Sequence, residues 1–212
     1  MSFEGIAKSF GAEVFYEFRQ STILQNLDSF EARQIEFPRG YIDARSDNST
    51  LGGCCFALCM VMMQGNFDYG YFLSKIKTKE GIGQIRGYQF INNQNVTFHD
   101  GQILRRIFTD YDVPIFGRIG LSFKNFKSYI KKKKVCFFHV VITCVSGAHA
   151  ICLGKIDNKI SVFDPNVGFF TFLDKPIKDV VACLDELTKF MGNYGGTGRR
   201  LRYIHRLTPK DV

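Results

Sequence analysis

The chain has 212 residues, of which 45% are apolar and 23% are charged. This length suits one domain or two tightly packed lobes, and the composition excludes a disordered chain. The net charge of +8 is compatible with an acidic protein partner, an anionic membrane surface or nucleic acid, and it selects none of them. Much of this charge lies in residues 131–134 and 199–206, where a solvated surface is a sufficient explanation.

The seven cysteines are odd in number and lie mostly in apolar segments. We therefore expect buried thiols in a reducing compartment rather than a disulfide framework. No CxxC pair is followed by a second pair at zinc-finger spacing, so we expect no metal ion, and no cofactor of another kind is indicated. The first 20 residues lack the apolar stretch of a cleaved secretory signal, and no run reaches the length of a membrane-spanning helix.

The first part of the chain is predicted to be mainly helical. Residues 12–27 carry apolar side chains at near-helical spacing, and turn-forming residues up to Gly53 precede a short apolar helix that begins at Cys55. This helix should be buried on all sides because it has no polar face. Further helices are predicted over residues 68–77, 100–109 and 122–133.

The last third of the chain is predicted to form an antiparallel sheet. Asp157 and Asn158 make a hairpin turn, and a helix over residues 176–191 precedes a last strand over residues 201–207. The other apolar strands are expected over residues 135–144, 149–156, 159–163 and 169–173. The predicted fold class is α+β in a single domain: a mainly helical lobe over about residues 1–134 meets a mainly β lobe over about residues 135–212. A catalytic site would lie where the two lobes meet.

Cys55 is the candidate nucleophile because it stands where the apolar helix should begin. The N-terminus of a helix stabilises a thiolate, and the preceding Gly52 and Gly53 let a substrate approach the following N–H groups, which can bind an oxyanion. Cys54, in the preceding turn, and Cys59, one turn deeper, compete for this role. Taken alone, Cys55 is better explained as a small hydrophobic residue of a buried helix.

A thiolate mechanism also needs a histidine base and a group that orients it. His149 opens a strand after a turn of small residues, and Asp164 follows 15 residues later. If these strands form one hairpin, Asp164 returns to the level of His149 and can accept its N–H. On its own, Asp164 fits equally well as a turn residue before Pro165. The other histidines are expected in the core or lack a context that would fix a base: His139, His99 and His205.

These segments together resemble the YopT/AvrPphB group of bacterial effector cysteine proteases. The matching features are the order Cys, His, Asp and the segments Gly-Gly-Cys-Cys-Phe-Ala-Leu at 52–58, Gly-Ala-His-Ala-Ile at 147–151 and Phe-Asp-Pro-Asn at 163–166. The resemblance implies a papain-like fold in which Cys55 attacks a carbonyl carbon, His149 transfers the proton and Asp164 orients His149. It also implies secretion by bacteria into the host cytoplasm and a host protein as substrate.

Papain-like enzymes also use a polar side chain shortly before the nucleophile as an oxyanion donor. Asn48, Ser49 and Thr50 are the candidates, and Asn48 is chosen because an amide N–H donates well. The doubled cysteine departs from the pattern of the group, because Cys54 stands where such enzymes often have an unreactive residue.

The sequence leaves three functions open. Proteolysis and glutamine deamidation can both use the same Cys, His and Asp, whereas a non-catalytic binding module would use a basic face to dock on an anionic membrane or an acidic protein. We expect no nucleic-acid binding. Lysines at 131–134 suit a helix end, and Gly195 to Gly198 lack the Lys-Ser/Thr ending of a phosphate loop. We expect a monomer.

Overall fold

The computed structural model describes residues 2–21, 54–94, 100–113, 115–116, 134–144, 147–190 and 200–210. Its helices are α1 (Phe3–Ser9), α4 (Cys55–Gln64), α5 (Tyr69–Lys75), α6 (Lys79–Gln94), α7 (Asp100–Ile107) and α9 (Ile177–Phe190). Its strands are β1 (Val14–Glu17), β2 (Tyr111–Asp112), β3 (Ile115–Phe116), β4 (Val135–Cys144), β5 (Gly147–Ile156), β6 (Lys159–Asp164), β7 (Gly168–Leu173) and β8 (Arg200–Pro209).

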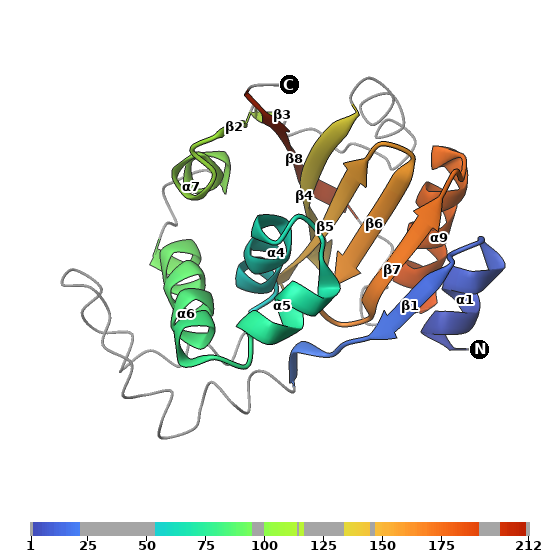
Figure 1. Ribbon diagram of the computed structural model, residues 1–212, viewed down its shortest axis with the longest axis horizontal. Coiled ribbons are helices and arrows are strands. Elements are labelled where there is room, and N and C mark those ends of the chain that lie inside the picture. Colours follow the sequence, from blue (N-terminus) through green and yellow to red (C-terminus); the bar gives the residue numbers. More distant parts are fainter. Residues whose placement is uncertain are drawn as a thin grey trace.

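An 8-stranded sheet forms the centre of the fold, in the order β1-β7-β6-β5-β4-β8-β2, with β3 paired to β8 (Figure 1). The neighbouring strands run antiparallel. Strands β4 to β7 follow one another in both sequence and space, which is the usual outcome of short hairpin connections. Asp157 turns the β5–β6 hairpin with a positive φ of 51°. The predicted antiparallel sheet is thus confirmed, including its last strand.

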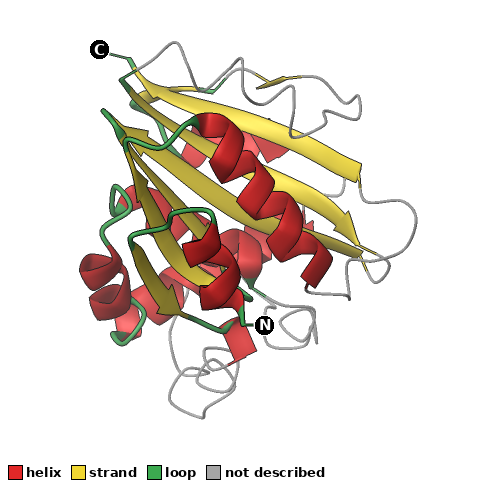
Figure 2. Ribbon diagram, turned by 90° about the vertical axis from the view of Figure 1, so that its right-hand side faces the viewer, coloured by secondary structure: helices red, strands yellow, loops and turns green. Residues whose placement is uncertain are grey.

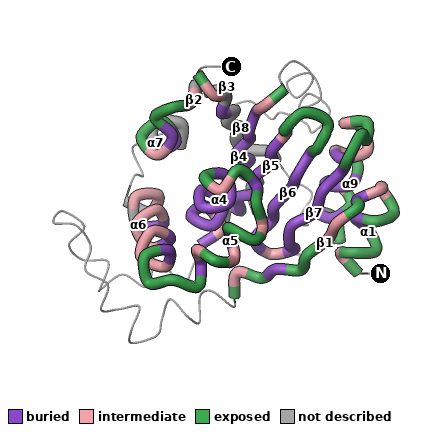
Figure 3. Tube along the Cα trace, in the orientation of Figure 1, coloured by how far each residue is buried: buried purple, intermediate pink, exposed green. Residues whose placement is uncertain are grey.

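Helices cover both faces of this sheet. Helix α4 contacts β5 and β6 on one face, and α9 runs across the other face beside α1 (Figure 2). Every residue of α4 from Phe56 to Met63 is buried, as Figure 3 shows, because the helix is apolar all round. Burying each large side chain of this helix contributes about 1.5–3 kcal/mol to folding. The predicted central helix is therefore confirmed, with its start at Cys55.

The prediction of a helix over residues 12–27 is wrong at residues 14–17, which form the edge strand β1. Phe15 lies opposite Phe170 of β7, and the two rings stack with their centroids 6.2 Å apart. Apolar spacing in so short a run does not separate helix from strand, and pairing with β7 decides the outcome. The N-terminal segment belongs to the sheet rather than to the helical part. Residues 22–27 lie outside the described residues.

The remaining helix predictions are confirmed where they fall on described residues. Those over residues 68–77, 100–109 and 176–191 correspond to α5, α7 and α9, and Asp68 caps α5 by accepting the Tyr71 N–H at 2.8 Å. Helix α6 was not predicted, because its glycines and amides hide a weak apolar pattern. The predicted helix over residues 122–133 lies outside the described residues, and the single-domain prediction stays a prediction.

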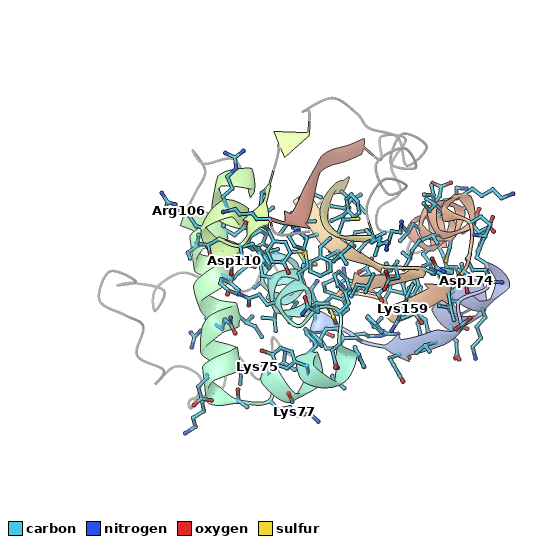
Figure 4. The ribbon with its side chains drawn as sticks, turned by 45° about the horizontal axis from the view of Figure 1, so that its top comes forward. Lys75, Lys77, Arg106, Asp110, Lys159 and Asp174 are labelled. Carbon is cyan, nitrogen blue, oxygen red and sulfur yellow. The ribbon has the colours of Figure 1, made fainter. Side chains whose placement is uncertain are left out.

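Charged side chains lie around the outside of the molecule, where Figure 4 labels Lys77, Arg106 and Asp174 among others. Lys75 lies over the ring of Tyr71, 5.9 Å from its centroid, in a cation–π arrangement. Residues 131–133 and 199 lie outside the described part of the chain, so the basic docking face stays a prediction. Among the described helices, none is long and apolar enough to cross a membrane.

Candidate active site

Cys55 is the first residue of α4, and Cys54 occupies the N-cap position without a side-chain cap. The N–H groups of a first helical turn have no acceptor within the helix, so they favour negative charge there. The backbone N–H of Ala150 on β5 donates to the Cys55 sulfur at 3.4 Å. Cys55 therefore lies between the start of a helix and a strand of the sheet, with N–H groups from both.

His149 and Asp164 lie at the end of the β5–β6 hairpin and are both buried. Nε2 of His149 is 2.8 Å from Oδ1 of Asp164, and the backbone N–H of Asn166 donates to the same oxygen at 2.8 Å. The hairpin registers Cys152 with Phe163, which brings Asp164 close to the level of His149. The hairpin thus brings together the two side chains that were predicted to pair.

The imidazole of His149 interacts with both the carboxylate of Asp164 and the thiol of Cys55. Burial by itself would lower the pKa of His149, but the charge and hydrogen bond of Asp164, together with Cys55, raise that pKa to about 10. Nε2 is occupied by Asp164, so Nδ1 is the nitrogen left to face Cys55. The structure thus brings together all three side chains that the sequence singled out.

The three neighbouring cysteines differ in ionisation. Burial raises the pKa of Cys54 to about 12, and burial with neighbouring thiols raises the pKa of Cys59 well above its usual range. Burial also opposes ionisation of Cys55, yet the hydrogen bond and charge of His149 and the N–H groups of Ala150 and Phe56 lower its pKa below 9.0. A thiolate is the reactive form of cysteine. Cys55 is consequently the thiol of the three that is suited to act as a nucleophile.

The other predicted residues lie apart from this arrangement or cannot be placed. His139 is buried in the core, where its ring meets Phe56 edge-on at a centroid distance of 5.3 Å. His205 lies opposite His139 on β8. The remaining candidates fall outside the described residues: Asn48, Ser49, Thr50, Gly52, Gly53 and His99.

Two polar residues at this site were not predicted as functional. Gln20 follows β1 and accepts the N–H of Cys54 at 2.9 Å, and it donates to the side chain of Asn166. Nδ2 of Asn166 lies 3.5 Å from Nδ1 of His149. The Asp-Pro-Asn segment contained a signal for Asn166, whereas Gln20 lies 34 residues before Cys54 and carries no local motif.

Neither metal binding nor disulfide formation is indicated in the described part of the chain. No group of three His, Cys, Asp or Glu side chains there could hold a metal ion. Six thiols whose side chains the structure describes are free: Cys54, Cys55, Cys59, Cys136, Cys152 and Cys183.

No family model and no curated protein matches the sequence. Among solved structures, the Pseudomonas avirulence protein AvrPphB is similar with a TM-score of 0.50 and 11% identity, over 76% of this chain and 95% of that chain. PatoxP, a cysteine protease-like domain of the Photorhabdus asymbiotica toxin PaTox, aligns with a TM-score of 0.49 and 13% identity, over 99% of this chain and 59% of that chain. The likeness to AvrPphB confirms the predicted fold class: α+β, with a helix that begins at Cys55 packed on an antiparallel sheet that carries His149 and Asp164.

Proposed function

We propose that this protein is a cysteine hydrolase that acts on amide bonds of host proteins, with Cys55 as nucleophile, His149 as base and Asp164 as the residue that orients His149. Its proposed form of action is proteolysis, as an effector delivered by bacteria into the host cytoplasm. The observation that carries the proposal is geometric: Cys55 begins α4 against β5, and on that strand His149 has its Nε2 2.8 Å from Oδ1 of Asp164. The lowered pKa of Cys55 and the raised pKa of His149 agree with it, because opposite shifts favour a thiolate–imidazolium pair.

In the first half of the reaction, the Cys55 thiolate adds to the carbonyl carbon of the amide. The tetrahedral intermediate then breaks its C–N bond, and the proton on Nδ1 of His149 passes to the leaving amine. A thioester on Cys55 and a neutral His149 result. Asp164 keeps its hydrogen bond to Nε2 throughout and so holds the ring in place.

In the second half, water replaces the amine. His149, now neutral, takes a proton from water as the water oxygen attacks the thioester carbon. The C–S bond breaks, the acid product leaves, and the thiolate–imidazolium pair is restored. Both halves develop negative charge on the carbonyl oxygen, which the N–H groups at the start of α4 can stabilise. Asn48 remains the predicted side-chain donor to this oxyanion.

Delivery into the host cell and a host protein as substrate are also proposals, and they rest on the family resemblance. A host protein is the proposed substrate, and a monomer is the proposed active form. A net charge of +8 would favour substrates or membrane surfaces that carry negative charge. No nucleic-acid partner is proposed.

The proposal can be tested by incubating wild type and Cys55→Ser with host-cell lysate and comparing the products by mass spectrometry. Cys183→Ala is a matched control, because it removes a buried thiol on the opposite face of the sheet. We expect wild type and Cys183→Ala to cut a host protein into two fragments that Cys55→Ser does not produce. Identical products from wild type and Cys55→Ser would contradict any hydrolase function and favour the binding module.

The same experiment distinguishes proteolysis from glutamine deamidation. A deamidase would leave the target uncut and raise its mass by about one dalton, because an amide becomes an acid. Loss of this mass change in Cys55→Ser would keep the proposed residues but replace proteolysis by deamidation.

A further inference from the structure

A chain of hydrogen bonds runs from the N-terminal edge of the sheet to the imidazole of His149. It begins at Gln20, whose backbone N–H donates to the Pro165 carbonyl at 2.7 Å. The Gln20 side chain then links Cys54 to Asn166, and Asn166 reaches His149. The side-chain contacts of Gln20 join residues 34 and 146 apart in sequence, whereas Asn166 and His149 belong to one hairpin. The part of the chain that starts at Gln20 therefore depends on the fold rather than on local structure.

The direction of every bond in this chain follows from its first member. The N–H of Cys54 can only donate, so the Gln20 atom that faces it at 2.9 Å must be the oxygen. The Gln20 nitrogen then faces Asn166, which must present its own oxygen to it. Consequently, the Asn166 amide nitrogen is the atom that lies 3.5 Å from Nδ1 of His149. Because an amide nitrogen only donates, it favours an unprotonated Nδ1.

The opposite side of the imidazole leads to the same conclusion. Nε2 lies 2.8 Å from the Asp164 carboxylate, which can only accept when ionised, so Nε2 carries the proton. The lone pair of Nδ1 is therefore left to accept a proton from Cys55. Asp164 alone would hold the imidazole strongly protonated, whereas a donor at Nδ1 works against protonation.

We propose that Gln20 is a positioning residue that orients the Asn166 amide, and that Asn166 in turn directs Nδ1 of His149 at Cys55 and weakens its hold on a proton. The inference rests on the proposed function, since it explains how the proposed base is held ready. Asn166 contacts Nδ1 of His149 directly, whereas Gln20 touches none of the reacting atoms. Gln20 acts only through Asn166, which makes the proposal testable as a coupling between two side chains.

The test measures the pKa of His149 by ¹⁵N NMR in a Cys55→Ser background. Among the described residues, the titratable groups that face His149 are Asp164 from β6 and Cys55 from α4, so this background leaves Asp164 as the remaining one. Gln20→Met removes both side-chain bonds of Gln20 without a change in charge. Asn166 can then turn its oxygen toward a protonated Nδ1, and the pKa of His149 should rise by about one unit.

A double variant shows whether the effect passes through Asn166. In an Asn166→Ala background, Gln20→Met should no longer change the pKa of His149, because the connecting amide is gone. Gln84→Met is the matched control: Gln84, on α6, also links two side chains, Gln64 at 2.8 Å and Tyr88 at 2.9 Å. It should leave the pKa of His149 unchanged.

If Gln20→Met does not fold, Gln20→Glu serves instead. It keeps an acceptor for the Cys54 N–H but cannot donate to Asn166, so it should raise the pKa more, and the Asn166→Ala background isolates the effect of its charge. An unchanged pKa in the folded Gln20 variants, or an equal shift with and without Asn166, would overturn the proposal. A lower catalytic rate with an unchanged pKa would instead assign Gln20 to the oxyanion. Failure of the hydrolase proposal would appear separately, as slow labelling of Cys55 in wild type.

Discussion

The two faces of the sheet are both covered by a helix that contributes a cysteine, yet the two cysteines differ in chemistry. Cys183 on α9 has its pKa raised to about 12 by burial alone. Cys55 on α4 has its pKa lowered, although burial opposes ionisation there as well. The difference lies in the neighbours: apolar side chains surround Cys183, whereas His149 and two backbone N–H groups face Cys55.

The helices themselves show the same contrast. Helix α9 is amphipathic, with Val180, Leu184 and Leu187 buried against the sheet and Lys189 paired with Asp185 on the exposed side at 3.0 Å. Helix α4 has no exposed face, and its N-terminus ends against the sheet. A buried helix that begins against a central strand of the sheet presents the free N–H groups of its first turn at one place. The α9 face thus stabilises the fold, while the α4 face also carries the proposed chemistry.

The largest difference between the two faces should appear in catalytic activity, when the thiol on one face only is removed. Cys55→Ala should reduce formation of the lysate products by about 10⁴-fold or more, because no other group can form the acyl intermediate. Cys183→Ala should leave the rate of product formation within a few-fold of wild type, since this thiol only packs. Mass-spectrometric time courses measure both variants. Equal losses in the two would show that the faces do not differ in chemistry.

A change on the α9 face should affect stability without affecting the site. Leu184 is 3% exposed and belongs to the apolar cluster beneath α9. Leu184→Ala should lower the free energy of unfolding by about 2–4 kcal/mol, through lost burial and the cavity left behind. Urea denaturation measures the loss. The rate at which iodoacetamide labels Cys55 in the folded protein should stay the same, and a large fall in this rate would contradict the separation of the two faces.

Asp164→Asn should change stability in a way that depends on pH. The pKa of His149 in the fold, about 10, lies above its ordinary value of 6.5. The stabilisation by Asp164 is therefore fully present below pH 6.5 and lost as pH rises through about 10. The variant should unfold more easily by about 2 kcal/mol near neutral pH. Denaturation between these two pH values should show the difference shrink, and a constant difference would contradict the ion pair.

Much of the sheet and part of the site follow from sequence patterns alone. The strands from β4 to β7 alternate with clear turn residues, so the hairpin that joins His149 to Asp164 could be predicted. The wholly apolar run after Cys55 likewise predicts a buried helix and its start. These features are local, because each depends on residues within one hairpin or one helix.

Features that depend on distant contacts could not be predicted. β1 is a strand because β7 pairs with it, although its apolar spacing also fits a helix. Gln20 reaches the site through Cys54 and Asn166, which lie 34 and 146 residues away in sequence. A single glutamine in a polar segment carries no signal of such contacts. The fold alone reveals them.

The central claim is that His149 activates Cys55 and no other thiol. The most direct measurement is the rate of iodoacetamide labelling of each of the seven cysteines at neutral pH, in wild type and in His149→Ala. Cys55 in wild type should react faster than the other six, and His149→Ala should slow it by about 30-fold, since an unassisted thiol is only a few per cent ionised. Slow labelling of all seven, or labelling of Cys55 that does not depend on His149, would contradict the account.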